Sequence, residues 1–147
     1  MSKKREIKFF KPTGSYGFLC NFYPSKITIG KVNYESVEHY YQSRKAKSKN
    51  VRVWIASAPN GHYAFNAGRA IVSGEHVKNW NKIRVKVMRR ALLAKFTQNT
   101  NLRLKLLKTG NAVLHEDNPY GSYWAIDGKD VLGRLLMELR EKLRQKE

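Results

Sequence analysis

The stretch KITIGKVNYESVEHYYQSRKAK, residues 26–47, contains two kinds of local structure in succession. Its first part has a glycine inside an apolar run, which favours a tight hairpin at residues 28–32. Its second part begins at Ser36, a residue type that often caps helices, and places Tyr40 and Tyr41 where they can pack. A hairpin that leads directly into a helix indicates that strands and helices share one α+β fold.

Patterns on either side of this stretch extend the same architecture. The chain before it is extended at residues 7–10 and 16–24, and residues 111–116 and 123–127 have the pattern of strands. Apolar periodicity predicts helices, the third short enough to be a turn, over residues 36–48, 50–58, 63–72, 77–96, 99–108 and 132–145. With neither a repeat nor a linker, residues 1–147 are expected to form a single compact, mostly helical α+β domain with a small β-sheet.

The composition favours a folded protein in a reducing compartment. Of the 147 residues, 41% are apolar and 12% aromatic, which is typical of a globular chain. No apolar run approaches the roughly 18 residues of a membrane span, and the basic start lacks the apolar segment of a secretory signal. Cys20, the sole cysteine, permits neither an intrachain disulfide nor a zinc cluster built on thiolates. We therefore expect a cytoplasmic protein with no membrane partner.

The strong positive charge indicates an anionic partner. Lys and Arg total 29 against 11 Asp and Glu, a formal net charge of +18. Such a chain attracts polyanions, among them DNA, RNA and nucleotides, although a solubilising surface would have the same composition. If a nucleic-acid strand binds, the candidate contacts outside a pocket are Lys47, Lys49, Arg52, Lys78 and Lys82. The sequence leaves the oligomeric state open.

One face of the helix expected at residues 36–48 has an unusual composition. At about 100° per residue, Glu38, Tyr41, Gln42 and Lys45 gather on one side. A surface helix would place Glu and Lys four apart, where they can pair, but here they are seven apart. A structural role is the alternative, with Glu38 bonding near the helix start and Lys45 in solvent.

The long helix expected at residues 77–96 has cations inside its apolar stripe. Arg84 lies about 40° from Trp80 on a helical wheel, and Lys95 falls on the same stripe. Such a cation either extends its charged end to the edge of the stripe or lines a pocket that binds an anion.

Common motifs of catalysis are missing. The sequence has neither a Walker nor a Rossmann glycine motif for phosphate binding. Its four histidines are far apart without an H-x-x-x-H pair, so no metal site is expected. Cys20 lies between Leu19 and Asn21 in an expected strand, which favours a small buried residue over a thiol nucleophile.

Six blocks of sequence resemble, in order and spacing, the YbiA-like or NADAR family. They are YGFLCNFYPSKI, YESVEHYYQSRKA, AGRA, WNKIRVKVMRRALLAKFTQN, LLKTGNAVLHEDNPYGSYWAI and GKDVLGRLLMELR, within residues 8–143. The resemblance implies the family's own α+β fold and an N-glycosidase that needs no metal or other cofactor. The implied substrate is a ribosylated nucleobase or an ADP-ribosylated nucleotide.

The resemblance leaves three functions open. Cleavage of ADP-ribosylated guanine, free or in nucleic acid, is favoured because of the positive charge. The second function is cleavage of early riboflavin-pathway intermediates by the same chemistry. The third is a non-catalytic module that binds ADP-ribose or nucleic acid.

The resemblance also implies the residues of the site. Glu38 would stabilise positive charge on the sugar or activate water, Lys45 would attack C1′ to form a Schiff base, and Gln42 would orient a hydroxyl or water. The expected substrate-binding residues are Gly17, Phe18, Asn21, Tyr41, Arg69, Trp80, Arg84, Phe96, Asn99, Glu116 and Trp124.

The chain departs from the family pattern at a few positions. Cys20 replaces a common serine, with little expected effect. Gly121 and Ala125 stand in a block that usually reads D-x-x-W-G, and Asp130 replaces an asparagine. The missing acid near Gly121 could alter the substrate or lower activity, unless it is partly replaced by Asp117 or Asp127.

Overall fold

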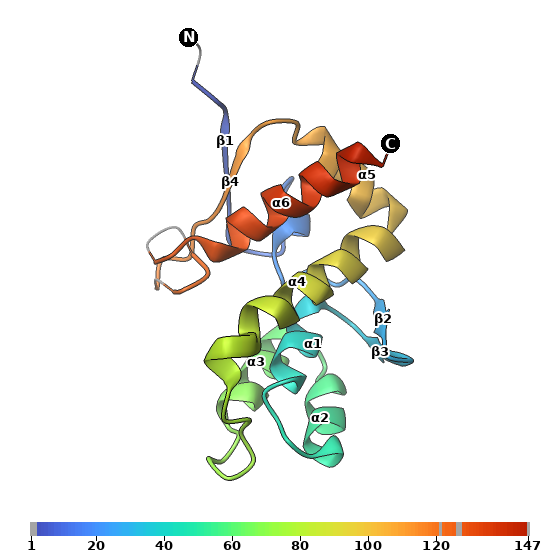
Figure 1. Ribbon diagram of the computed structural model, residues 1–147, viewed down its shortest axis with the longest axis vertical. Coiled ribbons are helices and arrows are strands. Elements are labelled where there is room, and N and C mark those ends of the chain that lie inside the picture. Colours follow the sequence, from blue (N-terminus) through green and yellow to red (C-terminus); the bar gives the residue numbers. More distant parts are fainter. Residues whose placement is uncertain (1–2, 121, 126–127, 147) are drawn as a thin grey trace. The chain divides into compact units, whose positions relative to one another are not determined.

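The computed structural model describes residues 3–120, 122–125 and 128–146. Helices predominate along the chain (Figure 1). The helices are α1 (Val37–Ser43), α2 (Lys49–Ala56), α3 (Gly61–Arg69), α4 (Trp80–Gln98), α5 (Thr100–Lys108) and α6 (Val131–Gln145). The strands are β1 (Glu6–Phe9), β2 (Ile27–Ile29), β3 (Val32–Tyr34) and β4 (Val113–Glu116), and η1 (Gly17–Leu19) is a short 3₁₀ helix. The expected α+β class, mostly helical with little sheet, is confirmed.

Contacts divide the chain into two units. The end unit consists of Met1–Cys20 and Thr100–Glu147, and contains β1, β4, α5 and α6. The central unit is Asn21–Asn99, and contains the strands β2 and β3 with helices α1 to α4. The expectation of one domain over residues 1–147 stays a prediction. Within the described ranges, no helix is long and apolar enough to cross a membrane.

The hairpin that opens the central unit has the turn that the sequence predicts. Strands β2 and β3 pair antiparallel, with Ile27 opposite Tyr34. Between them Gly30 and Lys31 both have positive φ, 59° and 68°. Two successive residues of this conformation match the twist of the flanking strands, so the hairpin closes in two residues.

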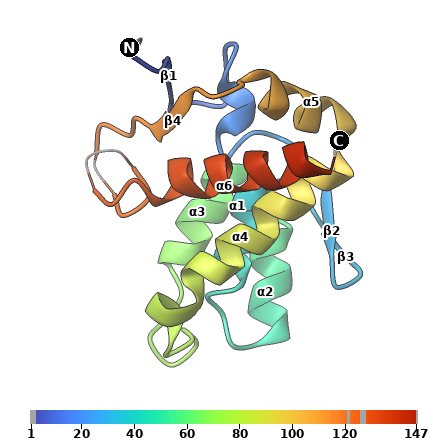
Figure 2. The ribbon, with the colours of Figure 1, turned by 45° about the horizontal axis from the view of Figure 1, so that its top comes forward.

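Helix α1 is buried along its whole length in the central unit. All seven of its residues are buried, and it packs against α2, α3 and α4 (Figure 2). Ser36 caps it, because its Oγ accepts the backbone N–H of His39 at 3.3 Å. The polar side chains of such a helix must find partners inside the protein.

Helix α1 ends at Ser43, earlier than the expected residue 48. The N–H of Lys45 donates to the carbonyl of Gln42, three residues back, at 3.2 Å. Two residues later the N–H of Lys47 donates to the carbonyl of Glu75 at 2.8 Å. Pairing with a distant segment therefore overrides local helix propensity, and Lys45 lies in the turn that follows the helix.

The end unit is built on a parallel pair of strands. Strands β1 and β4 align Glu6 with Val113 and Phe9 with Glu116. Parallel strands need a long connection, and here the whole central unit lies between them in the sequence. Helix α6 packs on β4, and the leucine stripe expected on this helix is buried, at Leu132, Leu135, Leu136, Leu139 and Leu143.

Two segments expected as strands have other structures. Residues 16–24 contain η1, where the N–H of Leu19 donates to the carbonyl of Tyr16 at 3.0 Å. Glycine is required at position 17, because a Cβ there would lie 2.6 Å from the carbonyl carbon of Pro12. Residues 123–125 form a turn, and 126–127 lie outside the described residues.

Candidate active site

Glu38 lies in the first turn of α1 and is 5% exposed. Its Oε1 accepts a hydrogen bond from Gln42 Nε2 at 2.7 Å. Burial raises the pKa of the Glu38 carboxyl to about 7, although the Gln42 hydrogen bond and the positive charge of Lys45 oppose the shift. A carboxyl with this pKa exchanges a proton near neutral pH, as acid–base catalysis requires.

Gln42 is one turn further along the same buried face. Its Nε2 is occupied by Glu38, whereas its buried Oε1 has no hydrogen-bond partner among the described residues. A buried acceptor without a partner is uncommon in native proteins. The expected role of Gln42, orienting a hydroxyl or water, stays a prediction.

Lys45 lies against an aromatic pair at the end of this face. Its Nζ is 5.6 Å from the ring centroid of Tyr41 and 5.9 Å from that of Trp80. The centroids of the two rings are 5.0 Å apart. Burial lowers the pKa of the Lys45 amine, the Glu38 charge opposes this, and the charge of Arg69 lowers it further. A lowered pKa increases the fraction of neutral amine, the nucleophilic form.

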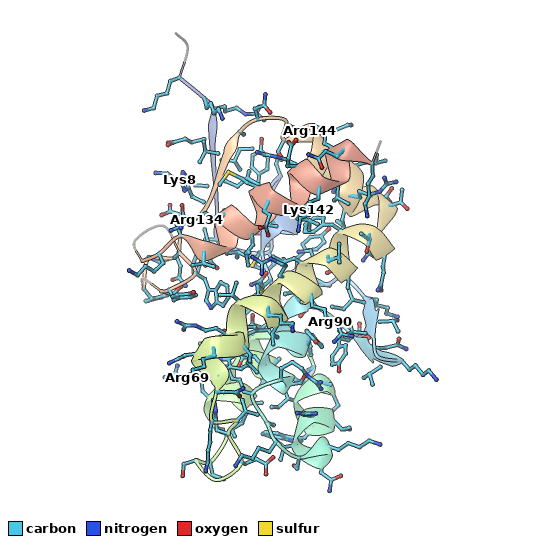
Figure 3. The ribbon with its side chains drawn as sticks, in the orientation of Figure 1. Lys8, Arg69, Arg90, Arg134, Lys142 and Arg144 are labelled. Carbon is cyan, nitrogen blue, oxygen red and sulfur yellow. The ribbon has the colours of Figure 1, made fainter. Side chains whose placement is uncertain are left out.

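Arg69 ends α3 (Figure 3), and its positive charge is the one that lowers the pKa of Lys45 further. Its guanidinium carbon is 5.5 Å from the ring centroid of Phe65. His76, which sequence reasoning did not select, has its ring centroid 6.4 Å from that of Trp80. The sequence could not show that His76 lies near Trp80, because the backbone pairing of residues 45–47 with residues 75–77 brings this histidine there.

Asn21 meets the start of α1 at its backbone. Its carbonyl accepts the N–H of Glu38 at 3.1 Å, and its Nδ2 lies 3.6 Å from the sulfur of Met88. The buried Oδ1 of Asn21 has no hydrogen-bond partner in the described part of the chain. Asn21 therefore joins Glu38, Tyr41, Gln42, Lys45, Arg69 and Trp80 as the expected residues that the central unit brings together.

Three further expected residues lie on or just after α4. Arg84 is half-buried, Phe96 is fully buried, and Lys95 is 5.1 Å from the Phe96 ring centroid. Asn99 Nδ2 donates to the carbonyls of Lys26 at 3.2 Å and Lys95 at 2.9 Å. These bonds tie the end of α4 to the chain before β2. Substrate contact by Arg84, Phe96 and Asn99 stays a prediction.

The remaining expected residues belong to the end unit. Gly17 and Phe18 are buried in η1, with Lys105 Nζ 5.7 Å from the Phe18 ring centroid. Glu116 ends β4, and Trp124 has its ring 5.1 Å from that of Tyr123. The substrate-binding roles of Gly17, Phe18, Glu116 and Trp124 stay predictions.

The positions that depart from the family pattern also lie in the end unit. Ala125 is fully buried, and its carbonyl accepts the N–H of Asp130 at 2.9 Å. Asp130 lies at the start of α6, and its carboxylate is 2.8 Å from Nδ1 of His115. Gly121 and Asp127 are outside the described residues. In the described ranges, no three His, Cys, Asp or Glu side chains are grouped to ligate a metal ion.

The family model for the NADAR domain matches residues 8–144, so the chain belongs to the NADAR family. It is 36% identical to a riboflavin biosynthesis protein of Vibrio vulnificus, over 97% of this chain but 40% of the relative. It is 37% identical to the N-glycosidase YbiA of Escherichia coli K12, over 93% of this chain and 88% of the relative. An N-glycosidase of Nostoc punctiforme is 34% identical, over 94% and 92%.

A solved structure agrees with this assignment. The NMR structure of the E. coli protein YbiA matches with a TM-score of 0.89 and 35% identity, covering 99% of this chain and 89% of that one. The family and fold expected from the sequence are confirmed. The expected enzyme class, a hydrolase of N-glycosyl bonds, agrees with the names of the relatives.

Proposed function

We propose that the protein is an N-glycosidase that hydrolyses the bond between ribose C1′ and a base nitrogen, with its catalytic group on α1. The observation that carries this proposal is the buried Glu38 carboxyl, hydrogen-bonded to Gln42 and within the electrostatic influence of Lys45. As the base departs, positive charge develops on the sugar. A carboxylate held in a dry environment stabilises that charge more strongly than it would in water.

The same residues support two routes to the product. In the direct route, the Glu38 carboxylate stabilises the sugar cation and takes a proton from the water that attacks C1′. In the covalent route, the Glu38 carboxylate stabilises the positive charge on the sugar while the neutral Lys45 amine attacks C1′, and the base leaves with a proton that the amine loses. The sugar ring then opens to a Schiff base, and water releases the sugar. Both routes use an ionised Glu38, so activity should rise through pH values near 7.

We favour ADP-ribosylated guanine, free or within nucleic acid, as the substrate. The formal net charge of +18 supports an anionic substrate with several phosphates. A second candidate is an intermediate of riboflavin biosynthesis. It is supported by the names of two relatives, the riboflavin biosynthesis proteins of Vibrio vulnificus and Zea mays.

The test is a comparison of substrates with a matched pair of variants. The purified protein is incubated with ADP-ribosylated DNA and with ribosylaminopyrimidine intermediates, and base release is measured. Glu38→Gln should lower turnover at least ~10²-fold on the true substrate, as loss of a positioned acid–base or electrostatic group does. Glu35→Gln removes the same charge from an exposed position and should leave turnover unchanged. Turnover by Glu38→Gln within a few-fold of wild type would rule out Glu38 as the catalytic group.

A further inference from the structure

Helix α3 approaches α1 most closely where Gly68 faces Gln42. A Cβ at Gly68 would overlap the Gln42 Oε1 atom and would lie 2.8 Å from its Cδ and 3.1 Å from its Cβ. All three of the nearest atoms that a methyl group would meet therefore belong to this one side chain. A helix ordinarily favours alanine over glycine. Glycine is needed here because the Gln42 side chain occupies the place that a Cβ would take.

The glycine also determines which way the Gln42 amide faces. Its C–H group occupies the direction that the Cβ would take, so it points at the Gln42 Oε1. A carbonyl oxygen makes a weak favourable contact with such a group, whereas an amide NH₂ turned toward it would have no acceptor. The turned amide would also direct its oxygen at the Glu38 carboxylate, where two acceptors repel. The observed orientation instead directs Nε2 at Glu38.

We infer that Gly68 is a positioning residue for the proposed reaction, since it leaves the space in which the Gln42 amide is held with its donor toward the Glu38 carboxylate. The inference rests on the proposed function for its catalytic consequence. The next residue along α3, Arg69, supplies the positive charge near Lys45. Two neighbouring residues of α3 therefore affect the site: Gly68 leaves room for the Gln42 amide, and the charge of Arg69 lowers the pKa of Lys45.

The inference is tested with Gly68→Ala. The added methyl group should displace Gln42 and break its hydrogen bond to Glu38, so kcat should fall about 10- to 100-fold, as for loss of a hydrogen bond to a charged group. KM should change little. Because that hydrogen bond lowers the pKa of Glu38, the rising limb of the pH–rate profile should move to higher pH. Gly74→Ala is the matched control, since a Cβ there meets nothing within 4 Å.

A double variant separates positioning from a general effect on folding. In Gln42→Ala protein the two atoms that a methyl group at Gly68 would meet first, Oε1 and Cδ, are gone, and only the Cβ at 3.1 Å remains. Gly68→Ala should then have no further effect on kcat, and any loss of melting temperature seen in the single variant should be restored. Wild-type kcat and pH profile in Gly68→Ala, or effects that add fully in the double variant, would overturn the inference.

A second measurement keeps this test independent of the proposed activity. The Glu38 carboxyl can be titrated directly by NMR in ¹³C-glutamate-labelled protein, with Glu38→Gln identifying its signal. Its titration should move to higher pH in Gly68→Ala and stay in place in Gly74→Ala. If the wild type cleaves none of the substrates, the proposed function fails while this titration still decides the role of Gly68. An unmoved titration in folded Gly68→Ala overturns the inference.

Discussion

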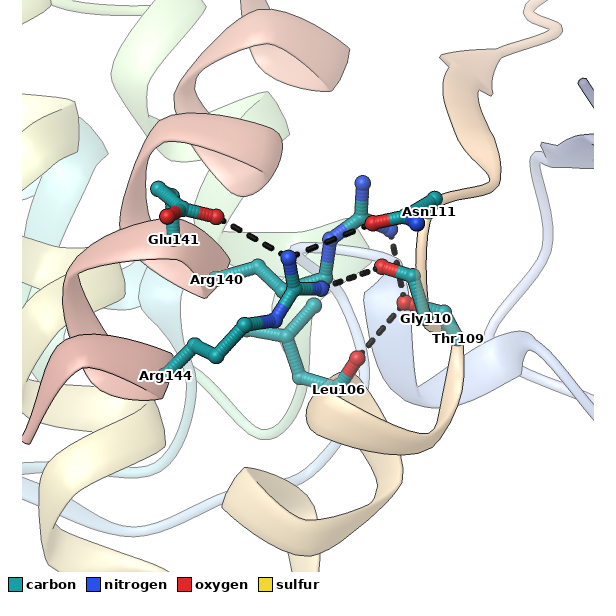
Figure 4. A network of polar contacts seen from close by, with 7 residues as sticks. All are labelled: Leu106, Thr109, Gly110, Asn111, Arg140, Glu141 and Arg144. Atoms are coloured by element: carbon teal, nitrogen blue, oxygen red, sulfur yellow. Dashed lines mark hydrogen bonds and ion pairs between the residues drawn. The ribbon is translucent and has the colours of Figure 1, made fainter. Parts of the chain in front are cut away.

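Helices α6 and α1 both bury polar side chains, and they use them differently. On α6, Arg140 is 6% exposed, and its Nη1 donates to Thr109 Oγ1 at 2.8 Å (Figure 4). Arg144 donates to the carbonyl of Gly110 at 2.6 Å and to Asn111 Oδ1 at 3.2 Å. These hydrogen bonds fasten α6 to the chain between α5 and β4.

On α1 and at Asn21, which meets the start of that helix, buried polar atoms lack hydrogen-bond partners among the described residues. They include Gln42 Oε1 and Asn21 Oδ1, and burial raises the pKa of Glu38. Unmet buried groups lower the stability of a fold, so they are typical of sites that bind a ligand. Burial of polar residues alone therefore does not mark a site. At Glu38 and Gln42 burial coincides with a vacant acceptor and a pKa raised to about 7 in directly bonded side chains, which supports a site there.

The largest effect that this comparison predicts follows removal of the Lys45 amine. Lys45→Ala should lower turnover by roughly 10³-fold or more, as removal of a nucleophile does. Borohydride added during turnover should trap the sugar on wild-type protein and not on the variant. Lys86→Ala, at an exposed position on α4, should behave as wild type. A sugar adduct that still forms on Lys45→Ala would assign the nucleophile elsewhere.

The next effect is on stability and depends on pH. The folded-state pKa of Glu38, about 7, is above its ordinary value of 4.5, so the fold favours the protonated form. Ionisation of Glu38 therefore reduces the free energy of unfolding progressively as pH rises from about 4.5 to 7, by up to about 3 kcal/mol. Glu38→Gln lacks this ionisation.

Urea unfolding at several pH values measures the difference. Relative to wild type, Glu38→Gln should gain stability between pH 5 and pH 8, while it loses activity. The gain should be smaller than the full figure, because the Gln side chain no longer supplies a negative charge to Lys45. A stability difference that does not change with pH would contradict the raised pKa.

The α6 network should respond in the opposite sense. Arg140→Met removes the hydrogen bond to Thr109 and should lower the free energy of unfolding by about 1–3 kcal/mol. Turnover per folded molecule should be unchanged, because this network is structural. Lys142→Met, an exposed change on the same helix, is the control for unfolding. If Arg140→Met lowers turnover and leaves the free energy of unfolding unchanged, the α6 network is not purely structural, and the contrast with α1 fails.

The elements that local sequence patterns determine could be predicted. Gly30 in the hairpin, Ser36 at the start of α1 and the leucine stripe of α6 all act through near neighbours. The early end of α1 could not be predicted, because the N–H of Lys47 is taken up by Glu75, far away in sequence. The requirement for glycine at position 17 depends likewise on the approach of Pro12.

The site was predictable to the same extent. The helical spacing of Glu38 and Gln42 indicates a shared face, and the structure places them in direct contact. Lys45 reaches that face from a turn, and Gly68 contributes only empty space, which no residue pattern displays. The family resemblance supplied Arg69, whereas its effect on the Lys45 pKa follows from three-dimensional proximity.

The smallest effect on catalysis is expected from residues outside the site. Lys47, Lys49 and Lys82 are exposed on the central unit, and no acidic residue occurs between Glu38 and Glu75 in the sequence. The Glu75 carboxylate is itself engaged, since it accepts the N–H of Ser48 at the start of α2. Exposed aromatic rings on the same unit, Trp54 and Tyr63, offer surfaces on which bases could stack. We therefore predict that a nucleic-acid strand binds this part of the chain.

Reversing the three lysines to glutamate tests whether a strand binds there. If each contacts a phosphate of a single strand, the slope of log affinity against log salt should fall in magnitude by about 0.7 per contact, or about 2 in all. Cleavage of the isolated modified nucleotide should stay nearly intact. Reversing Lys8, Arg134 and Lys142 makes the same charge change on the end unit (Figure 3) and should leave the slope closer to that of wild type. If strand and free nucleotide bind with equal affinity and equal salt dependence in the wild type, the charge does not serve strand binding, and a small metabolite becomes the better substrate.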